Sequence, residues 1–367
     1  MDVSSGVAGL VLGALMGLLL TVFFEDYLKD RRSRVGRRVR RLVARGGLPE
    51  QRAEFHLGPL KCPMLIVEGD GEQVINEQSV RVVVDHDPVE LPAEMVPWRD
   101  EVAAEQERRR AAGEHAFWNG PNYAVSGFTV SRTALDESPE VALRLRPADY
   151  YTFLTAQQLD REFADGTTPR ERYLAPTTPL DVPDFLNCSF GTNVAVITAD
   201  NLLVVQQRST RVGSQPGTWS SSANEALSRQ LDSRGRSAPN LYDVMRRGIV
   251  EELAIEETEY HLELLAFTID TRRQQWGALF VAFLHDLTGA DLVERRSKGV
   301  ADKWEHDRME FEAFEVAPVV RMLLSPQRRD RWSSVGPPLF YLALIRKYGR
   351  AHVERRAAVE LRRLGLK

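Results

Sequence analysis

The chain has 367 residues, 43% of them hydrophobic, so it is long enough for more than one domain with a sizeable core. A formal net charge of −4 at pH 7 gives no signature of nucleic-acid binding, and no specific nucleic-acid partner is expected. The two cysteines, Cys62 and Cys188, form no metal-ligand pattern, which favours reduced, partly buried thiols over a disulfide or a nucleophile.

Residues 6–24 contain no charged side chain and almost no polar one. A helix of this length measures about 28 Å, close to the hydrocarbon thickness of a bilayer. The alternatives are a buried core helix and a cleaved signal peptide. A signal peptide normally starts with basic residues and ends at small ones, whereas this segment follows MDVSS and ends in Phe23-Phe24. The pattern predicts one uncleaved transmembrane anchor within residues 1–30.

A basic segment at residues 31–48 follows the predicted span, while no Lys or Arg precedes it. The positive-inside rule then predicts a single-pass protein with its N-terminus outside and its main body in the cytoplasm. The basic segment could be read as a nucleic-acid patch, but attraction to anionic lipid headgroups is the simpler account beside a membrane. Gly9, Gly13 and Gly17 share one helix face and would allow a homodimer, although glycine is common in such helices.

Residues 49–186 predict an accessory α+β lobe. Trp98 to Ala112 is rich in Ala, Glu and Arg and favours an exposed helix, and Asp149 is a good N-cap for a second one. Proline-rich residues 176–183 indicate a junction. The predicted strands of this lobe are 64–67, 80–84, 123–130 and 140–145.

The next segment predicts a β-hairpin that leads into a helix. Residues 193–198 and 202–207 are strand candidates around a tight turn, and the second strand ends at Arg208. Residues 228–240 form a polar loop, and residues 241–255 carry apolar side chains at helical spacing. This helix brings Arg247 and Glu251 onto one face, and Glu251 with Glu252 offers the oxygen ligands that Mg²⁺ prefers.

The nine residues RGIVEELAI at 247–255 resemble the second half of a Nudix box, R-E-U-x-E-E-x-G-U with U bulky and apolar. Gly248 stands where the family has its first glutamate, and Ala254 where it has glycine. The first half of the box does not fit, since Ser233 and Pro239 occupy its places. The order of these elements is similar to that of Nudix domains. The hairpin comes first, Trp219 and small residues follow, and the predicted helix at 241–255, here called the box helix, comes last.

The resemblance implies a Nudix-like mixed β-sheet flanked by helices at residues 187–325. Predicted strands at 260–268, 275–284 and 309–314, the last at an edge, continue the sheet, and a long amphipathic helix within residues 326–367 closes the chain. The overall expectation is an α+β protein in which this domain follows the transmembrane helix and the accessory lobe.

The resemblance also implies a site. Glu251 and Glu252 would hold Mg²⁺ or Mn²⁺ and act in catalysis, with Arg247 orienting them. Arg208 and Trp219 would contact the substrate. A further ligand could come from Glu225, Glu305 or Glu310, whose alternative role is to meet water on a charged face.

Three functions remain open from these residues. One is a Mg²⁺-dependent Nudix-type pyrophosphohydrolase acting on a nucleoside diphosphate derivative at the cytoplasmic membrane face. Gly248 removes a carboxylate that active members use, so the second is a catalytically depleted domain that binds a nucleotide-like small molecule as a membrane-tethered sensor. The third is a scaffold that keeps the fold for protein contacts.

Overall fold

A mixed β-sheet runs through the part of the chain that the computed structural model describes, which is residues 54–367 without 135, 176, 213–214, 300–305 and 367. These residues form one compact unit. Within the described residues, no helix has the length and apolar character needed to cross a membrane. The predicted span 6–24, its glycines and the basic segment 31–48 lie outside the described residues, so the anchor stays a prediction.

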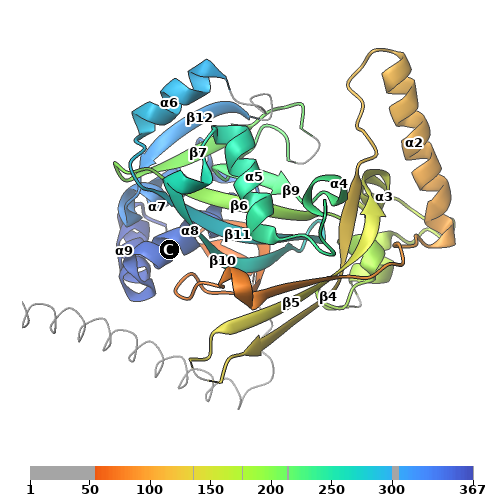
Figure 1. Cartoon of the computed structure of the whole chain (residues 1–367), viewed down its shortest axis with the longest axis horizontal. Helices are drawn as coiled ribbons and strands as arrows, with labels where there is room; N and C mark the ends of the chain where they lie inside the picture. Colours follow the sequence, from red (N-terminus) through yellow and green to blue (C-terminus); the bar gives the residue numbers. More distant parts are fainter. Residues whose placement is uncertain (1–53, 135, 176, 213–214, 300–305, 367) are drawn as a thin grey trace, which may run out of the picture. The chain divides into compact units, whose positions relative to one another are not determined.

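The main sheet joins strands from distant parts of the chain (Figure 1). Strands β11 and β6 pair in parallel at its centre, and its other pairs are antiparallel. The strand order is β1 (Glu54–Leu57), β2 (Leu60–Glu68), β10 (Tyr260–Asp270), β11 (Gln275–Leu284), β6 (Phe190–Ile197), β7 (Leu202–Arg208) and β12 (His306–Ala313).

Strands β6 and β7 separate soon after their turn. Ile197 pairs with Leu203 next to the turn, whereas further along β6 pairs with β9 (Ala223–Ala226) and β7 with β8 (Trp219–Ser220). Residues 219–226 therefore enter the sheet between the two strands of the hairpin. This insertion brings β9 against the box helix.

A smaller sheet of β3 (Val80–Val84), β5 (Pro139–Asp149) and β4 (Pro121–Arg132) comes from the predicted accessory lobe. Helices α2 (Val96–Ala111) and α3 (Tyr150–Ala156) accompany it, and Asp149 caps α3 by accepting a hydrogen bond from the Thr152 amide, as predicted. The same region also supplies β1 and β2 to the main sheet. A predicted boundary at residue 186 thus does not correspond to a break in that sheet.

The main sheet is buried on both faces, which explains the nearly continuous apolar runs of its central strands. Along β11, Phe280 and Ala282 pack toward the small sheet and α5 (Leu241–Leu253), while Leu279 and Val281 pack toward α7 (Val316–Leu324), α8 (Gly336–Tyr348) and α9 (Arg350–Arg363). Figure 1 shows α5 and α7–α9 on opposite sides of the sheet. The α+β class is confirmed.

The prediction of one long C-terminal helix is wrong. Gly349 separates α8 from α9 with a φ of +80°, a backbone conformation that glycine adopts without a steric cost. The sequence reading also passed over α6 (Gly289–Lys298), although Thr288 and Asp291 form a capping box at its start. The polar loop at residues 228–240 contains the short helix α4 (Arg229–Asp232).

The box helix has a defined start and a strained end. The Asn240 side chain accepts a hydrogen bond of 2.9 Å from the Tyr242 amide at the N-terminus. At the C-terminus Ala254 adopts a left-handed conformation with φ of +54°, at the position where the Nudix pattern has glycine. Alanine is strained there because its Cβ crowds the backbone.

Ala254→Gly is therefore expected to raise the free energy of unfolding of the full-length protein by about 1 kcal/mol. Ala104→Gly, at an exposed position inside α2, is the matched control and should lower it by about 1 kcal/mol. Urea denaturation measures both. A loss of stability in Ala254→Gly would show that the strain at this helix end is not released.

Candidate functional site

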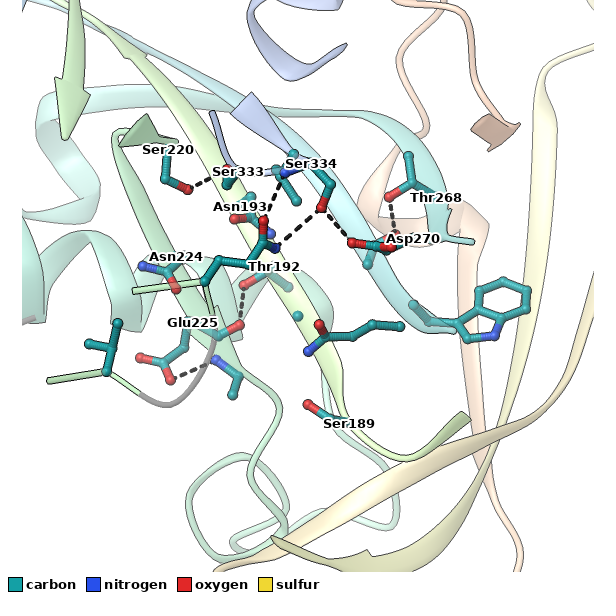
Figure 2. Close-up of a pocket in the computed structure, with 18 of the residues that line it drawn as sticks. Ser189, Thr192, Asn193, Ser220, Asn224, Glu225, Thr268, Asp270, Ser333 and Ser334 are labelled. Carbon is teal, nitrogen blue, oxygen red and sulfur yellow. Dashed lines mark hydrogen bonds between the residues drawn. The ribbon is translucent and has the colours of Figure 1, made fainter. Parts of the chain in front are cut away.

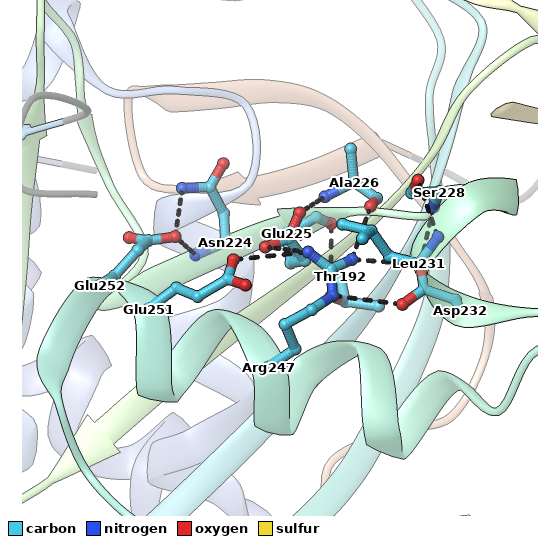
Figure 3. Close-up of polar contacts among 10 residues, drawn as sticks. All are labelled: Thr192, Asn224, Glu225, Ala226, Ser228, Leu231, Asp232, Arg247, Glu251 and Glu252. Carbon is cyan, nitrogen blue, oxygen red and sulfur yellow. Dashed lines mark hydrogen bonds and ion pairs between the residues drawn. The ribbon is translucent and has the colours of Figure 1, made fainter. Parts of the chain in front are cut away.

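Arg247 of the box helix lies among carboxylates from three elements (Figure 3). Its Nη1 is 2.8 Å from Glu225 Oε2 on β9 and 3.4 Å from Glu251 Oε2 one helical turn later. Its Nη2 and Nε donate to the two carboxylate oxygens of Asp232 on α4, at 3.1 and 3.2 Å. The expected contact between Arg247 and Glu251 is present, but the guanidinium also joins the helix to β9 and α4.

These ion pairs are mostly shielded from water. The side chain of Arg247 is 19% exposed, that of Glu225 17% and that of Asp232 7%. Burial raises the pKa of Asp232, which Arg247 and a hydrogen bond from the Ser228 amide partly offset. Burial also lowers the pKa of Arg247, but the surrounding carboxylates outweigh it and raise the pKa overall. The arginine thus compensates part of the negative charge of these buried carboxylates.

Glu252, the second carboxylate of the pair, points into the protein and is only 3% exposed. Its Oε1 accepts hydrogen bonds from the Asn224 amide at 2.8 Å and from Asn224 Nδ2 at 3.2 Å. Its Oε2 lies 3.1 Å from Nδ1 of His306 on β12. Burial, aided by Arg208 and Arg296, lowers the pKa of His306 to about 3, so the ring is neutral at pH 7.

Gly248 faces β9 at close range. A Cβ added at this position would lie 2.9 Å from Glu225 Cβ and 3.1 Å from Met245 Cε. A separation under 3.0 Å between two carbon atoms requires one of them to move. Glycine at position 248 thus allows β9 to pack against the helix, where the Nudix pattern has a glutamate.

The described carboxylates of the box are bonded to other protein groups. Throughout the described part of the chain, no group of three or more Asp, Glu, His or Cys side chains is arranged to hold a metal ion. Glu252 is engaged by Asn224 and His306, while Glu225 and Glu251 meet the guanidinium of Arg247. The box therefore contains a network of ion pairs at the place where the resemblance implies Mg²⁺ or Mn²⁺.

The other predicted ligands, Glu310 and Glu305, have different outcomes. Glu310 on β12 forms an ion pair with Arg328, and Glu305 lies outside the described residues. Trp219, predicted to contact substrate, is 5% exposed in the core beside α8, with the Arg328 guanidinium 4.2 Å from its ring centroid. Trp219 is not among the described residues that line the cavity next to the box.

That cavity, of about 310 Å³, adjoins β9 and contains the predicted residue Arg208 (Figure 2). Arg208 Nη1 donates to Asn224 Oδ1 at 2.7 Å, and Asn224 and Glu225 also line the cavity. Most of the polar residues that line it carry hydroxyl or amide side chains. Besides Asn224, they include Ser189, Thr192, Asn193, Gln215, Ser220, Thr268, Gln275, Ser333 and Ser334.

Aromatic side chains form another part of the wall. Trp276 comes from β11, while Phe117, Tyr150 and Phe153 come from the predicted accessory lobe. The Tyr150 ring centroid is 5.6 Å from that of Phe117 and 5.4 Å from that of Phe153. The predicted accessory region thus completes the cavity, a role that its sequence does not reveal.

Asp270 and Ser334 line the cavity on the side away from Glu225 (Figure 2). Ser334 Oγ donates to Asp270 Oδ2 at 2.6 Å. Gln215 Oε1 accepts from the Ser334 amide at 2.9 Å. These three residues come from distant parts of the chain, and sequence reasoning identified none of them. Asp270 follows a predicted strand, the one local signal among them.

Comparison with known proteins adds little. No family model matches this chain, and no curated protein matches it. The similar solved structures include a protein from Deinococcus radiodurans, 13% identical with a TM-score of 0.30, covering 42% of this chain and 81% of its own. They also include a MutT Nudix hydrolase from Burkholderia pseudomallei, 17% identical with a TM-score of 0.24, covering 34% and 82%. Likeness at these TM-scores carries no argument, so the Nudix-like fold stays a prediction.

Proposed function

We propose that this protein binds a nucleoside-like small molecule in the cavity beside β9, and that the box helix holds the cavity wall in place. The observation that carries the proposal is the double role of two residues. Asn224 and Glu225 line the cavity, and the same two side chains are bonded to Glu252 and Arg247 of the helix. Arg247 and Glu252 of the box thereby hold in place two side chains of the cavity wall.

The chemistry of the walls supports a ligand with an aromatic ring and several hydrogen-bonding groups. Aromatic side chains offer faces and edges for a planar ring, and the hydroxyl and amide groups both donate and accept. The volume of about 310 Å³ lies at the small end of the usual range for ligand pockets. A nucleoside combines a planar ring with a hydroxylated sugar and matches this lining.

The charged residues of the cavity are bonded to other protein groups. Arg208 donates to Asn224, Glu225 pairs with Arg247, and Asp270 accepts from Ser334. Recognition in this cavity would therefore come mainly from neutral groups, which hold an uncharged part of a ligand without a buried unpaired charge.

Hydrolysis of a nucleoside diphosphate derivative is supported less well. That reaction needs carboxylates that are available to a metal or to an attacking water. Position 248 has none, and the carboxylates of the box meet Arg247, Asn224 and His306. The predicted anchor would make the binding domain a membrane-tethered sensor, with anionic lipids and a second copy of the chain as further proposed partners.

Gly191→Leu is expected to weaken nucleoside binding by about tenfold or more, which corresponds to about 1.4 kcal/mol. Gly191 lies on β6 and lines the cavity, and a Cβ there would approach Asn193 Nδ2 and the Glu225 carbonyl no closer than 3.9 Å. A Cβ at position 191 therefore meets no close neighbour, and the larger side chain is expected to occupy ligand space. Calorimetric titration of the full-length protein with the four common ribonucleosides measures the effect.

Gly127→Leu is the matched control, because Gly127 also lies in a strand but is not among the residues that line the cavity. A Cβ at this position meets Arg144 Cβ at 3.4 Å, an ordinary contact. The Gly127→Leu variant should bind nucleosides with the affinity of the unmodified protein. The proposal would be overturned if Gly191→Leu also kept that affinity, or if the protein bound simple sugars and not nucleosides.

A further inference from the structure

A second cavity, of about 390 Å³, adjoins the first across a shared wall. Gln215, Asp270, Ser333 and Ser334 line both cavities. The remaining residues of the second cavity come from β2 and the turn before it, from the turn between β10 and β11, and from the segment before α8. The hydrogen bonds of Ser334 to Asp270 and Gln215 lie within this shared wall.

The two cavities differ in charge. Arg208 is the one cationic side chain among the described residues that line the first cavity, and it lies near Asn224. The second cavity has four cationic side chains and two acidic ones. They are Lys61, Arg272, Arg273 and Arg329, and Asp270 and Asp330. An excess of positive charge on this scale is suited to a phosphate group.

Both acidic side chains of the second cavity have partners in the protein. Asp330 Oδ1 lies 3.6 Å from Nε of Arg329. Asp270 is buried, and its Oδ1 accepts hydrogen bonds from the backbone amides of Arg272 and Arg273 at 3.0 and 3.1 Å. Asp270 thus fixes the turn that presents the two arginines, and its charge is partly compensated by these donors and by Ser334.

We infer that the second cavity binds the phosphate groups of a nucleotide whose base and sugar lie in the first cavity. This inference rests on the proposed function and specifies its ligand. The phosphates would face Lys61 and Arg272 in the second cavity, beyond the residues that line both cavities. In Figure 2 Asp270 and Ser334 lie across the first cavity from Glu225, so this orientation points the phosphates away from the box helix.

The test compares the four common ribonucleosides with their 5′-diphosphates, titrated calorimetrically into the full-length protein in EDTA. The diphosphate should bind at least about tenfold more tightly than the matching nucleoside. In the double variant Lys61→Gln/Arg272→Gln the advantage should fall to about threefold or less, while the affinity for the nucleoside stays unchanged. Both side chains are exposed, so their replacement should leave the fold intact.

Arg355→Gln/Arg356→Gln, on the exposed face of α9, removes the same number of positive charges and is the control for a general electrostatic effect. It should keep the preference for the diphosphate. If nucleosides bind but the diphosphates bind no better, or if the preference survives in Lys61→Gln/Arg272→Gln, this inference is wrong and the proposed function stands. If neither probe binds, the proposed function fails and the inference fails with it.

Discussion

Replacing Arg247 with methionine is expected to lower the free energy of unfolding at pH 7 by about 3 kcal/mol. The change keeps most of the apolar stem but leaves Glu225 and Asp232, with side chains 17% and 7% exposed, without their shared cation. An uncompensated buried carboxylate is costly because its hydration is not replaced. Urea denaturation of the full-length protein measures the loss.

The same loss should shrink in acid. Burial already raises the pKa of Asp232, and removing Arg247 raises it further because the arginine acts in the opposite direction. A carboxyl whose pKa is raised in the folded state takes up protons there before the unfolded chain does, so the variant regains stability as the pH falls through that pKa. The deficit at about pH 4.5 should therefore be smaller than at pH 7.

Arg246→Met provides the matched control from the adjacent residue. Arg246 pairs with Glu77, Asp243 and Glu257, whose side chains are 30%, 39% and 66% exposed. Solvent screens such pairs, so the expected loss is about 1 kcal/mol or less. If both variants lose the same free energy of unfolding, Arg247 stabilises its carboxylates no more than Arg246 stabilises more exposed ones.

The second large effect concerns the position that distinguishes this box from the family pattern. Gly248→Glu should lower the free energy of unfolding by about 3 kcal/mol. Its Cβ would lie 2.9 Å from Glu225 Cβ, and its carboxylate would enter a region that already contains Glu225 and Glu251. Thermal or urea denaturation would detect the loss.

The double variant Gly248→Glu/Glu225→Gly shows whether the loss of stability comes from the contact with Glu225. The alternative is that glutamate at this position destabilises the helix whatever lies opposite. Glu225→Gly removes the opposing Cβ and one carboxylate, so the two substitutions should be coupled, and the double variant more stable than the sum of the single changes by about 1 kcal/mol or more. Additive losses would mean that Glu225 is not what excludes a side chain at position 248.

Local patterns predicted some of the elements that carry this site, but not β9 or α4. The predicted helix at 241–255 corresponds to α5, and the apolar runs at 260–268 and 275–284 correspond to β10 and β11. Cys62 and Cys188 are both buried and not bonded to one another. Burial raises the pKa of both thiols, that of Cys62 to about 12.

The partners of the box residues could not be predicted, because they depend on tertiary contacts. Glu225 was a candidate ligand, yet what decides its role is the approach of Arg247 across the insertion of β9 between β6 and β7. His306 follows residues of no clear pattern and reaches Glu252 only because β12 pairs with β7.

The cavity could not be predicted from the sequence either. Its aromatic wall comes from residues 117, 150, 153 and 276, and the residues that it shares with the second cavity are 215, 270 and 333–334. Single hydroxyl and amide residues in separate loops carry no periodic signal. They become a site only when the small sheet and the segment before α8 meet the main sheet.

The most direct test of this account is the nucleoside and nucleotide titration repeated in Mg²⁺, in Mn²⁺ and in EDTA, with analysis of the products. We expect the nucleoside affinity to be the same, within about twofold, in all three conditions, and no release of phosphate-containing products from the nucleotides. Hydrolysis that depends on the metal and disappears in Glu251→Gln and Glu252→Gln would contradict the account and restore the hydrolase reading.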